Sequence, residues 1–325
     1  MAHNFEEMQK LIDWIKNMDI GDKTDRYNDV MSQLPQDEVG DAVYSDRGWP
    51  TFCDYVKNTQ PEKDKQYATA MVHWKDGTNS FLFLVYPQEK LHCEEILIKK
   101  LDKILRKKKE IAQHIYIFSL NSPCLGRCMC KLLHKGYEWY TRYKVRLCVA
   151  YTKFWGLRGP DDFNYLNYSD ISDFISVFFS YYEKCNADCF TLDQELLKGI
   201  KKINVFKSLK SDINEKDRHT VCKQISEAKK QLVMQSIHSP YRMRGKHLEC
   251  GKEIINELKF PPAVHKKVSK MLQEVWDKMV EDSLVILVRR SIAGQFNKKT
   301  VHLFQNKLNE ILGNNCPFTL RHITH

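Results

Sequence analysis

Residues 67–86 read YATAMVHWKDGTNSFLFLVY, in which two apolar, β-rich runs flank a short polar segment. The Asp76-Gly77 step in that segment favours the tight turn of a β-hairpin. We therefore predict two antiparallel strands, one over Tyr67–Trp74 and the other over Ser80–Tyr86. Such a hairpin needs further strands and a layer of helices to bury its apolar side chains.

Helix and strand patterns alternate along the chain after this hairpin. They predict, in order, a helix over residues 91–109, a strand over His114–Leu120, a helix over 124–140, a strand over Val145–Tyr151 and a fifth strand at Ile203–Phe206. Strands that alternate with helices are typical of α/β folds, in which helices bury the faces of a sheet. We therefore expect a five-stranded mixed sheet sandwiched by helices.

The segments that flank this α/β region have helical patterns. Apolar residues recur at three- and four-residue spacing between Phe5 and Met18, and a short helix is predicted around Phe52–Val56. An aromatic helix is expected over residues 162–184, and helical patterns predominate after Ser211. The chain is thus predicted to have three parts: an acidic N-terminal helical extension over residues 1–66, an α/β domain over 67–208 and a basic helical C-terminal region over 209–325.

The composition is that of a folded protein. The chain has 325 residues, of which 42% are apolar and 28% are charged, and these values exclude a largely disordered chain. The longest clean apolar run, Phe81–Tyr86, is too short to span a bilayer, so no membrane association is expected. Residues 1–7 lack the basic and apolar segments of a secretory signal, so we expect a cytoplasmic or nuclear protein that is not secreted. On that expectation, the eleven cysteines are reduced thiols or metal ligands.

Positive charge is concentrated in two blocks. The formal net charge is +10, and residues 67–160 and 201–325 carry +10 and +12, whereas residues 1–66 and 161–200 carry −6 each. Basic blocks of this kind suit an anionic partner, of which nucleic acid is the commonest. Lysine-rich helices that are only solvated have the same charge pattern, so charge alone leaves both interpretations open.

Two short fragments, each at the predicted start of a helix, have a metal-binding pattern. His92-Cys93-Glu94 opens the helix after the second strand, and Pro123-Cys124 with Cys128 opens the helix after the third. An H-x-E fragment followed by P-C and a second cysteine is the pattern of zinc nucleobase deaminases. One imidazole and two thiolates hold Zn²⁺ and leave one position for a water molecule, whose pKa the metal lowers. Glu94 is the expected proton shuttle, because its carboxylate can reach that water without binding the metal.

At these residues the sequence resembles the zinc-dependent cytidine deaminase superfamily, and most closely the AID/APOBEC-like polynucleotide deaminases. The resemblance covers about residues 67–208 and rests on four stretches, namely residues 92–94, 118–124, 149–155 and 195–205. It implies a cytidine deaminase-like catalytic domain with a Zn²⁺ cofactor held by His92, Cys124 and Cys128. It also implies contacts with substrate from the ends of the third and fourth strands, and the matching residues are Asn121, Ser122, Tyr151, Lys153, Phe154 and Trp155.

Two departures from the family pattern concern the candidate site itself. Three residues separate Cys124 from Cys128, where the usual gap is two, and Gly126 can absorb the extra residue as a small bulge. Cys130 is a second candidate for the third ligand, but the near-one-turn spacing of Cys128 keeps both thiolates at the helix N-terminus. Asn121 stands where the family has a tryptophan, so another group must form the wall against which the base rests.

Three functions fit these features. The first is hydrolytic deamination of cytosine to uracil in single-stranded DNA or RNA, with Tyr151, Phe154 and Trp155 stacking on bases and Lys153 contacting phosphate. The second is the same reaction on a free nucleoside or nucleotide. The third is a nucleic-acid-binding or interaction protein whose zinc site is structural, against which Glu94 argues because such a site does not need it.

Overall fold

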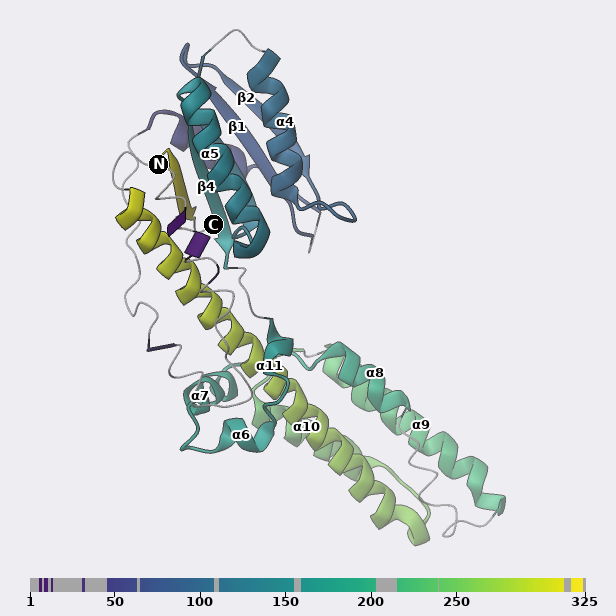
Figure 1. Ribbon diagram of the computed structural model, residues 1–325. Helices are drawn as coiled ribbons and strands as arrows, with labels where there is room; N and C mark the ends of the chain where they lie inside the picture. The colour runs from purple at the N-terminus through teal and green to yellow at the C-terminus, as the bar shows by residue number, and fades with distance from the viewer. Residues whose placement is uncertain are drawn as a thin grey trace. The chain divides into compact units, whose positions relative to one another are not determined.

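The computed structural model describes residues 46–62, 65–107, 111–154, 159–202, 215–238, 240–312 and 317–323, with a few earlier positions (Figure 1). The chain divides into two compact units. The first unit comprises residues 1–158 and 294–325, and the second comprises residues 159–293. The helix predicted between Phe5 and Met18 lies largely outside the described residues.

The first unit is built on a five-stranded mixed sheet with the strand order β2-β1-β3-β4-β5. Strand β1 (Ala68–Trp74) pairs antiparallel with β2 (Asn79–Val85) and with β3 (Ala112–Asn121). Strand β4 (Arg146–Lys153) pairs parallel with β3 and with β5 (Phe318–His322). The predicted hairpin is therefore present, and Gly77 adopts a φ of +86° in its turn, a conformation that glycine reaches without strain.

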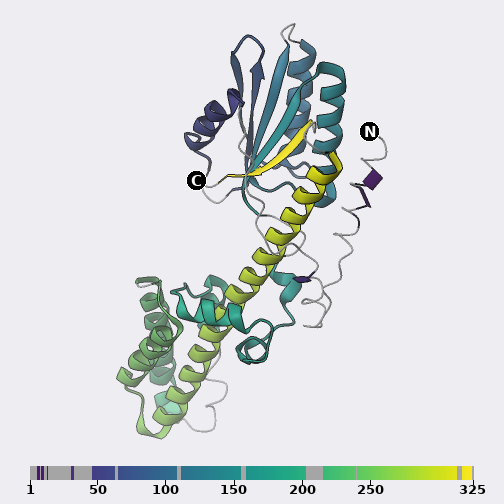
Figure 2. The same ribbon diagram turned by 90° about the vertical axis from the view of Figure 1, so that its left-hand side faces the viewer.

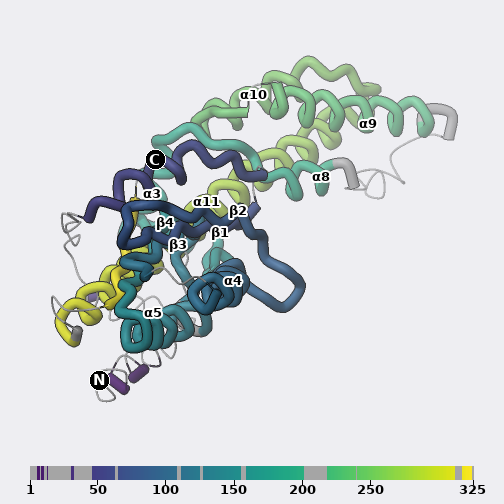
Figure 3. The backbone as a smooth tube through the Cα atoms, turned by 90° about the horizontal axis from the view of Figure 1, so that it is seen from above, coloured from purple at the N-terminus to yellow at the C-terminus, as the bar shows by residue number. Residues whose placement is uncertain are grey.

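Helices cover both faces of this sheet (Figures 2 and 3). On one face, α4 (Cys93–Lys107), α5 (Cys130–Tyr143) and the end of α11 (Pro262–Leu312) bury a core. This core includes Leu97, Leu132 and Phe304. On the other face, α3 (Gly48–Lys57) packs Phe52 and Val56 against Tyr116 and Phe118 of β3. The expected sheet sandwiched by helices is confirmed.

The fifth strand comes from a different part of the chain than the sequence predicted. Strand β5 (Phe318–His322) lies beside β4, whereas Ile203–Phe206, where this strand was expected, is outside the described residues. Two parallel neighbours need a crossover connection, and here the last turns of α11 cover the sheet before the chain enters β5. The compact units therefore differ from the predicted limits of 1–66, 67–208 and 209–325, because residues 294–325 complete the sheet of the first unit.

The second unit is helical, in agreement with the pattern after Ser211. It contains a 3-10 turn (Pro160–Phe163), α6 (Tyr168–Ser172), α7 (Phe179–Ala187), α8 (Gln194–Lys202), α9 (Glu215–His238), α10 (Arg244–Glu257) and the first part of α11. The single aromatic helix predicted over residues 162–184 is wrong, because the chain is broken between α6 and α7. There Asp173 and Ser176 accept hydrogen bonds from the backbone of Ile175 and Phe178, which competes with helical pairing. None of the described helices is long and apolar enough to cross a membrane.

Candidate active site

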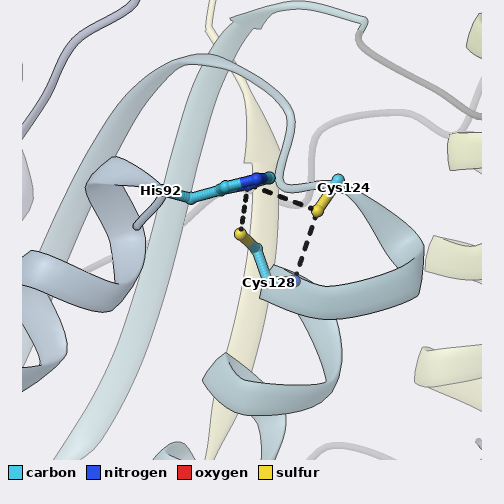
Figure 4. A group of neighbouring side chains, drawn as sticks. All are labelled: His92, Cys124 and Cys128. Atoms are coloured by element: carbon cyan, nitrogen blue, oxygen red, sulfur yellow. Dashed lines mark hydrogen bonds between the residues drawn. The ribbon is translucent and has the colours of Figure 1, made fainter. Parts of the chain in front are cut away.

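The three predicted metal ligands meet beside the carboxyl end of the central strand β3. His92 lies immediately before α4, Cys124 follows β3, and Cys128 lies within the helical turn Leu125–Met129. The Nδ1 atom of His92 is 3.1 Å from Sγ of Cys128 and 3.6 Å from Sγ of Cys124 (Figure 4). The ligand atoms of all three residues lie within 4.8 Å of one another. Residues 32 positions apart in the sequence are therefore brought together as expected.

A π-helical turn over Leu125–Met129 accommodates the additional residue between the two cysteines. The N–H group of Met129 donates to the carbonyl oxygen of Cys124 at 3.0 Å, a bond across five residues rather than four. Such a turn is an α-helix with one residue inserted, and it is frequent at functional sites. The predicted bulge near Gly126 thus takes the form of a π-turn, and it directs Cys128 toward His92. Cys130 instead begins α5, and its Sγ lies 3.6 Å from Oε1 of Gln9.

The donor set and its spacing fit a zinc ion. Zn–S bonds of about 2.3 Å and Zn–N bonds of about 2.0 Å, at tetrahedral angles, place neighbouring ligand atoms about 3.5–3.8 Å apart. The two distances from His92 Nδ1 are close to this range without any change of backbone. An imidazole with two thiols is also a ligand set that zinc prefers, and three protein ligands leave a fourth position open.

The two thiols differ in acidity. The pKa of Cys124 is lowered to about 6 by hydrogen bonds from the Cys128 thiol and the Cys128 backbone N–H, with His92 nearby, against the effect of burial. The pKa of Cys128 is raised because its thiol donates to Cys124, is buried and lies near Glu94. These contacts stabilise a thiolate in the pair, and the thiolate is the form that binds metals.

Glu94 is buried beside the three ligands but is not one of them. Its Oε1 atom accepts a hydrogen bond of 2.8 Å from Oγ of Ser119. Its Oε2 atom is 3.4 Å from Sγ of Cys128, so this oxygen faces the three ligands. The carboxylate thus has one oxygen held by the protein and the other directed at the site, as the prediction for a proton shuttle requires.

Glu95 connects the His92 segment to the π-turn that carries Cys128, a role that the sequence did not reveal. Its carboxylate is only 5% exposed and accepts from the backbone N–H of His92 at 2.9 Å. Arg127, in the π-turn, donates to both carboxylate oxygens, at 3.1 and 2.7 Å, and Lys131 donates to Oε1. Although burial by itself raises the pKa of Glu95, the bonds from Lys131, the His92 backbone and Arg127 lower it to about 2.

Replacing Glu95 by glutamine is expected to lower the free energy of unfolding by about 1–3 kcal/mol, because charge-assisted hydrogen bonds are lost from a buried group. The folded-state pKa lies below the unfolded value of about 4.3, so the ionised carboxylate stabilises the fold above that pH. This contribution is lost as the pH falls toward 2.

Thermal unfolding between pH 7 and pH 3 measures both effects. Glu95→Gln should unfold at a lower temperature at pH 7, and the difference from the parent should shrink with acidity. Glu138→Gln, which removes a half-exposed partner of Lys135, is the matched control. A difference that is unchanged at pH 3 would contradict this assignment.

A cavity of about 230 Å³ adjoins the metal ligands. Its walls include Gln66, Pro87, His92, Cys93, Glu94, Asn121, Ser122 and Cys124. Asn121 and Ser122, the residues predicted to contact substrate, line this cavity, and the backbone N–H of Ser122 donates to the carbonyl oxygen of Lys153 at 2.7 Å. Gln66 was missed, because nothing in a polar segment before a strand distinguishes it.

The aromatic residues after β4 are placed differently from the prediction. Tyr151 is fully buried in the core on the α4–α5 face, and its ring packs against Phe154 and His322. Its predicted stacking on a base does not fit this position, because this side chain points inward from β4. Phe154 also packs on His302 of α11, whereas Lys153 is exposed and pairs in register with Asn121. Trp155 lies outside the described residues.

The family described as Secreted Novel AID/APOBEC-like Deaminase 3 (SNAD3) matches residues 15–184, more than half of the chain. No curated protein matches the chain. The family's name points to secretion, so the prediction of a cytoplasmic or nuclear protein that is not secreted is wrong. That prediction depended only on the first few residues of the sequence.

The matched segment contains Glu94 and all three clustered ligands, His92, Cys124 and Cys128. The fold agrees with this match, since it has a five-stranded sheet covered by helices and places these residues beside the carboxyl end of β3. The chain therefore belongs to the Secreted Novel AID/APOBEC-like Deaminase 3 family of AID/APOBEC-like deaminases.

Proposed function

We propose that the protein is a zinc-dependent deaminase that hydrolyses cytosine to uracil in single-stranded DNA or RNA. The observation that carries this proposal is the position of Glu94. It is buried and hydrogen-bonded through Oε1, and Oε2 faces the three ligands beside a small cavity. A structural zinc site needs no such carboxylate, whereas hydrolytic deamination needs a group that moves protons between water and the base.

Different residues of the chain would perform different parts of the deamination reaction. Zinc held by His92, Cys124 and Cys128 would supply a water molecule activated for attack on C4 of the base. Glu94 Oε2 takes one proton from that water and delivers it to N3 of the ring. The same oxygen then moves the second proton of the water, from the hydroxyl that has formed on C4, to the exocyclic nitrogen, and the C4–N bond breaks to release ammonia. The oxygen atom of the water remains on C4, so cytosine becomes uracil.

The cavity supports a single base as the reacting group. Its volume of about 230 Å³ is below the range of roughly 300–1,000 Å³ that is usual for drug-sized ligands. The side chains of Asn121 and Ser122 supply polar groups in its wall, where a base edge needs hydrogen-bond partners. A base taken from a flexible single strand enters such a pocket at a lower cost in unstacking than one taken from a duplex.

A polynucleotide substrate is favoured by charge near the cavity. Lys153 is exposed at the end of β4, opposite Asn121 at the end of β3, and is available to a phosphate. Residues 67–160, which contain the three ligands and Glu94, carry a net charge of +10. Binding that depends on such charges releases counterions from the nucleic acid and therefore weakens as salt is added.

A substrate panel tests this proposal. The purified protein is incubated with single-stranded DNA, single-stranded RNA, free cytidine and free deoxycytidine, and uracil or uridine formation is measured. We expect conversion in a single strand, with activity that falls as the salt concentration rises. Conversion of the free nucleosides alone would establish the second function. Nucleic-acid binding without conversion of any substrate by zinc-loaded protein would favour a binding module.

A further inference from the structure

A chain of two hydrogen bonds leads from the cavity wall to Glu94. Oγ of Ser119 donates to Oε1 of Glu94 at 2.8 Å, and Nε2 of Gln66 donates to Oγ of Ser119 at 3.0 Å. Ser119 is fully buried near the end of β3. Gln66 precedes β1 and lines the cavity.

The direction of both hydrogen bonds follows from the number of protons available. A serine hydroxyl has one hydrogen to donate, and Ser119 donates it to Oε1 of Glu94. The same hydroxyl can therefore only accept from Gln66. The amide nitrogen of Gln66 must consequently face Ser119, which leaves Oε1 buried without a hydrogen-bond partner among the described residues. An unpaired buried carbonyl is unfavourable, which indicates that the contact with Ser119 determines how the amide is oriented.

We propose that Gln66 and Ser119 are positioning residues that hold Glu94 in its catalytic orientation, an inference that rests on the deaminase function proposed above. With Oε1 engaged by Ser119, only Oε2 is free to exchange protons with the water and the base. The same bond tethers the carboxylate through Oε1, so that Oε2 faces the three ligands but the group cannot move closer and bind the metal that they would hold. Ser119 thus keeps Glu94 as a proton shuttle rather than a metal ligand.

Variants of both residues test this arrangement by kinetics. Ser119→Ala removes the donor to Glu94, Gln66→Met removes the donor to Ser119, and Gln66→Glu replaces that donor with an acceptor of the same shape. Each is expected to lower kcat by about 10- to 100-fold, as for a misplaced catalytic group, with little change in KM. Because both residues act through one bond, Gln66→Met should have no further effect in a Ser119→Ala background.

Ser80→Ala is the matched control. Its hydroxyl also accepts a hydrogen bond within the sheet, from Nε1 of Trp74 at 2.9 Å, but it lies in β2 away from the cavity. Zinc content and thermal unfolding are measured for every variant, so that loss of metal or of fold is distinguished from loss of positioning. The proposal is overturned if kcat stays within about twofold of the parent, or if the effects of the two single variants multiply in the double variant.

Cobalt substitution gives a second measurement that does not depend on activity. The visible spectrum of Co²⁺ reports its ligands, so Glu94→Gln should leave the spectrum of the parent unchanged. Ser119→Ala should change it, because Glu94 becomes free to coordinate, and the change should vanish in the Ser119→Ala, Glu94→Gln double variant. If the parent proves inactive on every substrate, the proposed deaminase function fails, and an unchanged cobalt spectrum in Ser119→Ala then overturns the positioning role as well.

Discussion

Cys124→Ala and Cys128→Ser are expected to abolish zinc binding, whereas Cys130→Ser is expected to leave it intact. The reason is geometric, because Sγ atoms of Cys124 and Cys128 lie within 4.8 Å of Nδ1 of His92, and Cys130 is directed toward Gln9. The parent should contain about one zinc ion per chain, since the structure offers three ligands and one open position.

Stability should follow the metal in these variants. Zinc held by these ligands would join His92, which precedes α4, to the π-turn, so its loss is expected to lower the temperature of unfolding. Metal analysis of the purified proteins, together with thermal unfolding before and after treatment with a chelator, measures both effects. Loss of zinc from Cys130→Ser but not from Cys128→Ser would move the third ligand to Cys130. Well-folded parent protein that contains no zinc after expression in zinc-supplemented medium would remove the basis of the metal assignment.

Glu94→Gln is expected to retain zinc and fold but to lose deaminase activity by at least about 10²- to 10⁴-fold, the usual contribution of a general acid–base group. The amide has the same size and keeps the hydrogen bond from Ser119 to its oxygen, but it cannot take up and release protons. Single-stranded nucleic acid should still bind with the affinity of the parent, because that affinity depends on basic residues rather than on the proton shuttle.

Rates of cytosine conversion and affinities for a labelled single strand test the two halves of this expectation. Glu310→Gln is a suitable control, since Glu310 forms only an exposed pair with Lys307 on α11. A Glu94→Gln protein that converts cytosine as fast as the parent would show that Glu94 is not the shuttle. If the zinc-loaded parent and the zinc-loaded Glu94→Gln variant bind nucleic acid equally and neither converts cytosine, the result would instead favour a nucleic-acid-binding protein with a structural zinc site.

Local patterns were sufficient for the strands and helices that carry the site. The hairpin of β1 and β2, the strands β3 and β4 and the helices α4 and α5 all lie close to their predicted ranges. Alternation of apolar residues and the Asp76-Gly77 turn are properties of neighbouring residues, which a sequence displays directly. The grouping of His92 with Cys124 and Cys128 was also predictable, because an H-x-E fragment and a later P-C fragment with a second cysteine, each opening a helix, form the ligand pattern of zinc deaminases.

Features that depend on distant pairing were decided by the tertiary structure. Phe318–His322 and Ile203–Phe206 are both short β-prone runs, and only pairing beside β4 identifies the first of them as the fifth strand. Both faces of β4 are covered by packed elements, and this buries Tyr151 in the core on the α4–α5 face instead of presenting it to a base.

The polar contacts around Glu94 and Glu95 were also decided by the tertiary structure. Ser119, Gln66 and Arg127 are ordinary polar residues in the sequence, and each acquires a partner only when strands and helices from separate segments meet. The residues that the chemistry requires can thus be recognised in the sequence, because metal ligation requires particular atoms at particular spacings. The orientation of those residues depends on hydrogen bonds across the fold, since a buried donor or acceptor takes whichever partner the packing brings within reach.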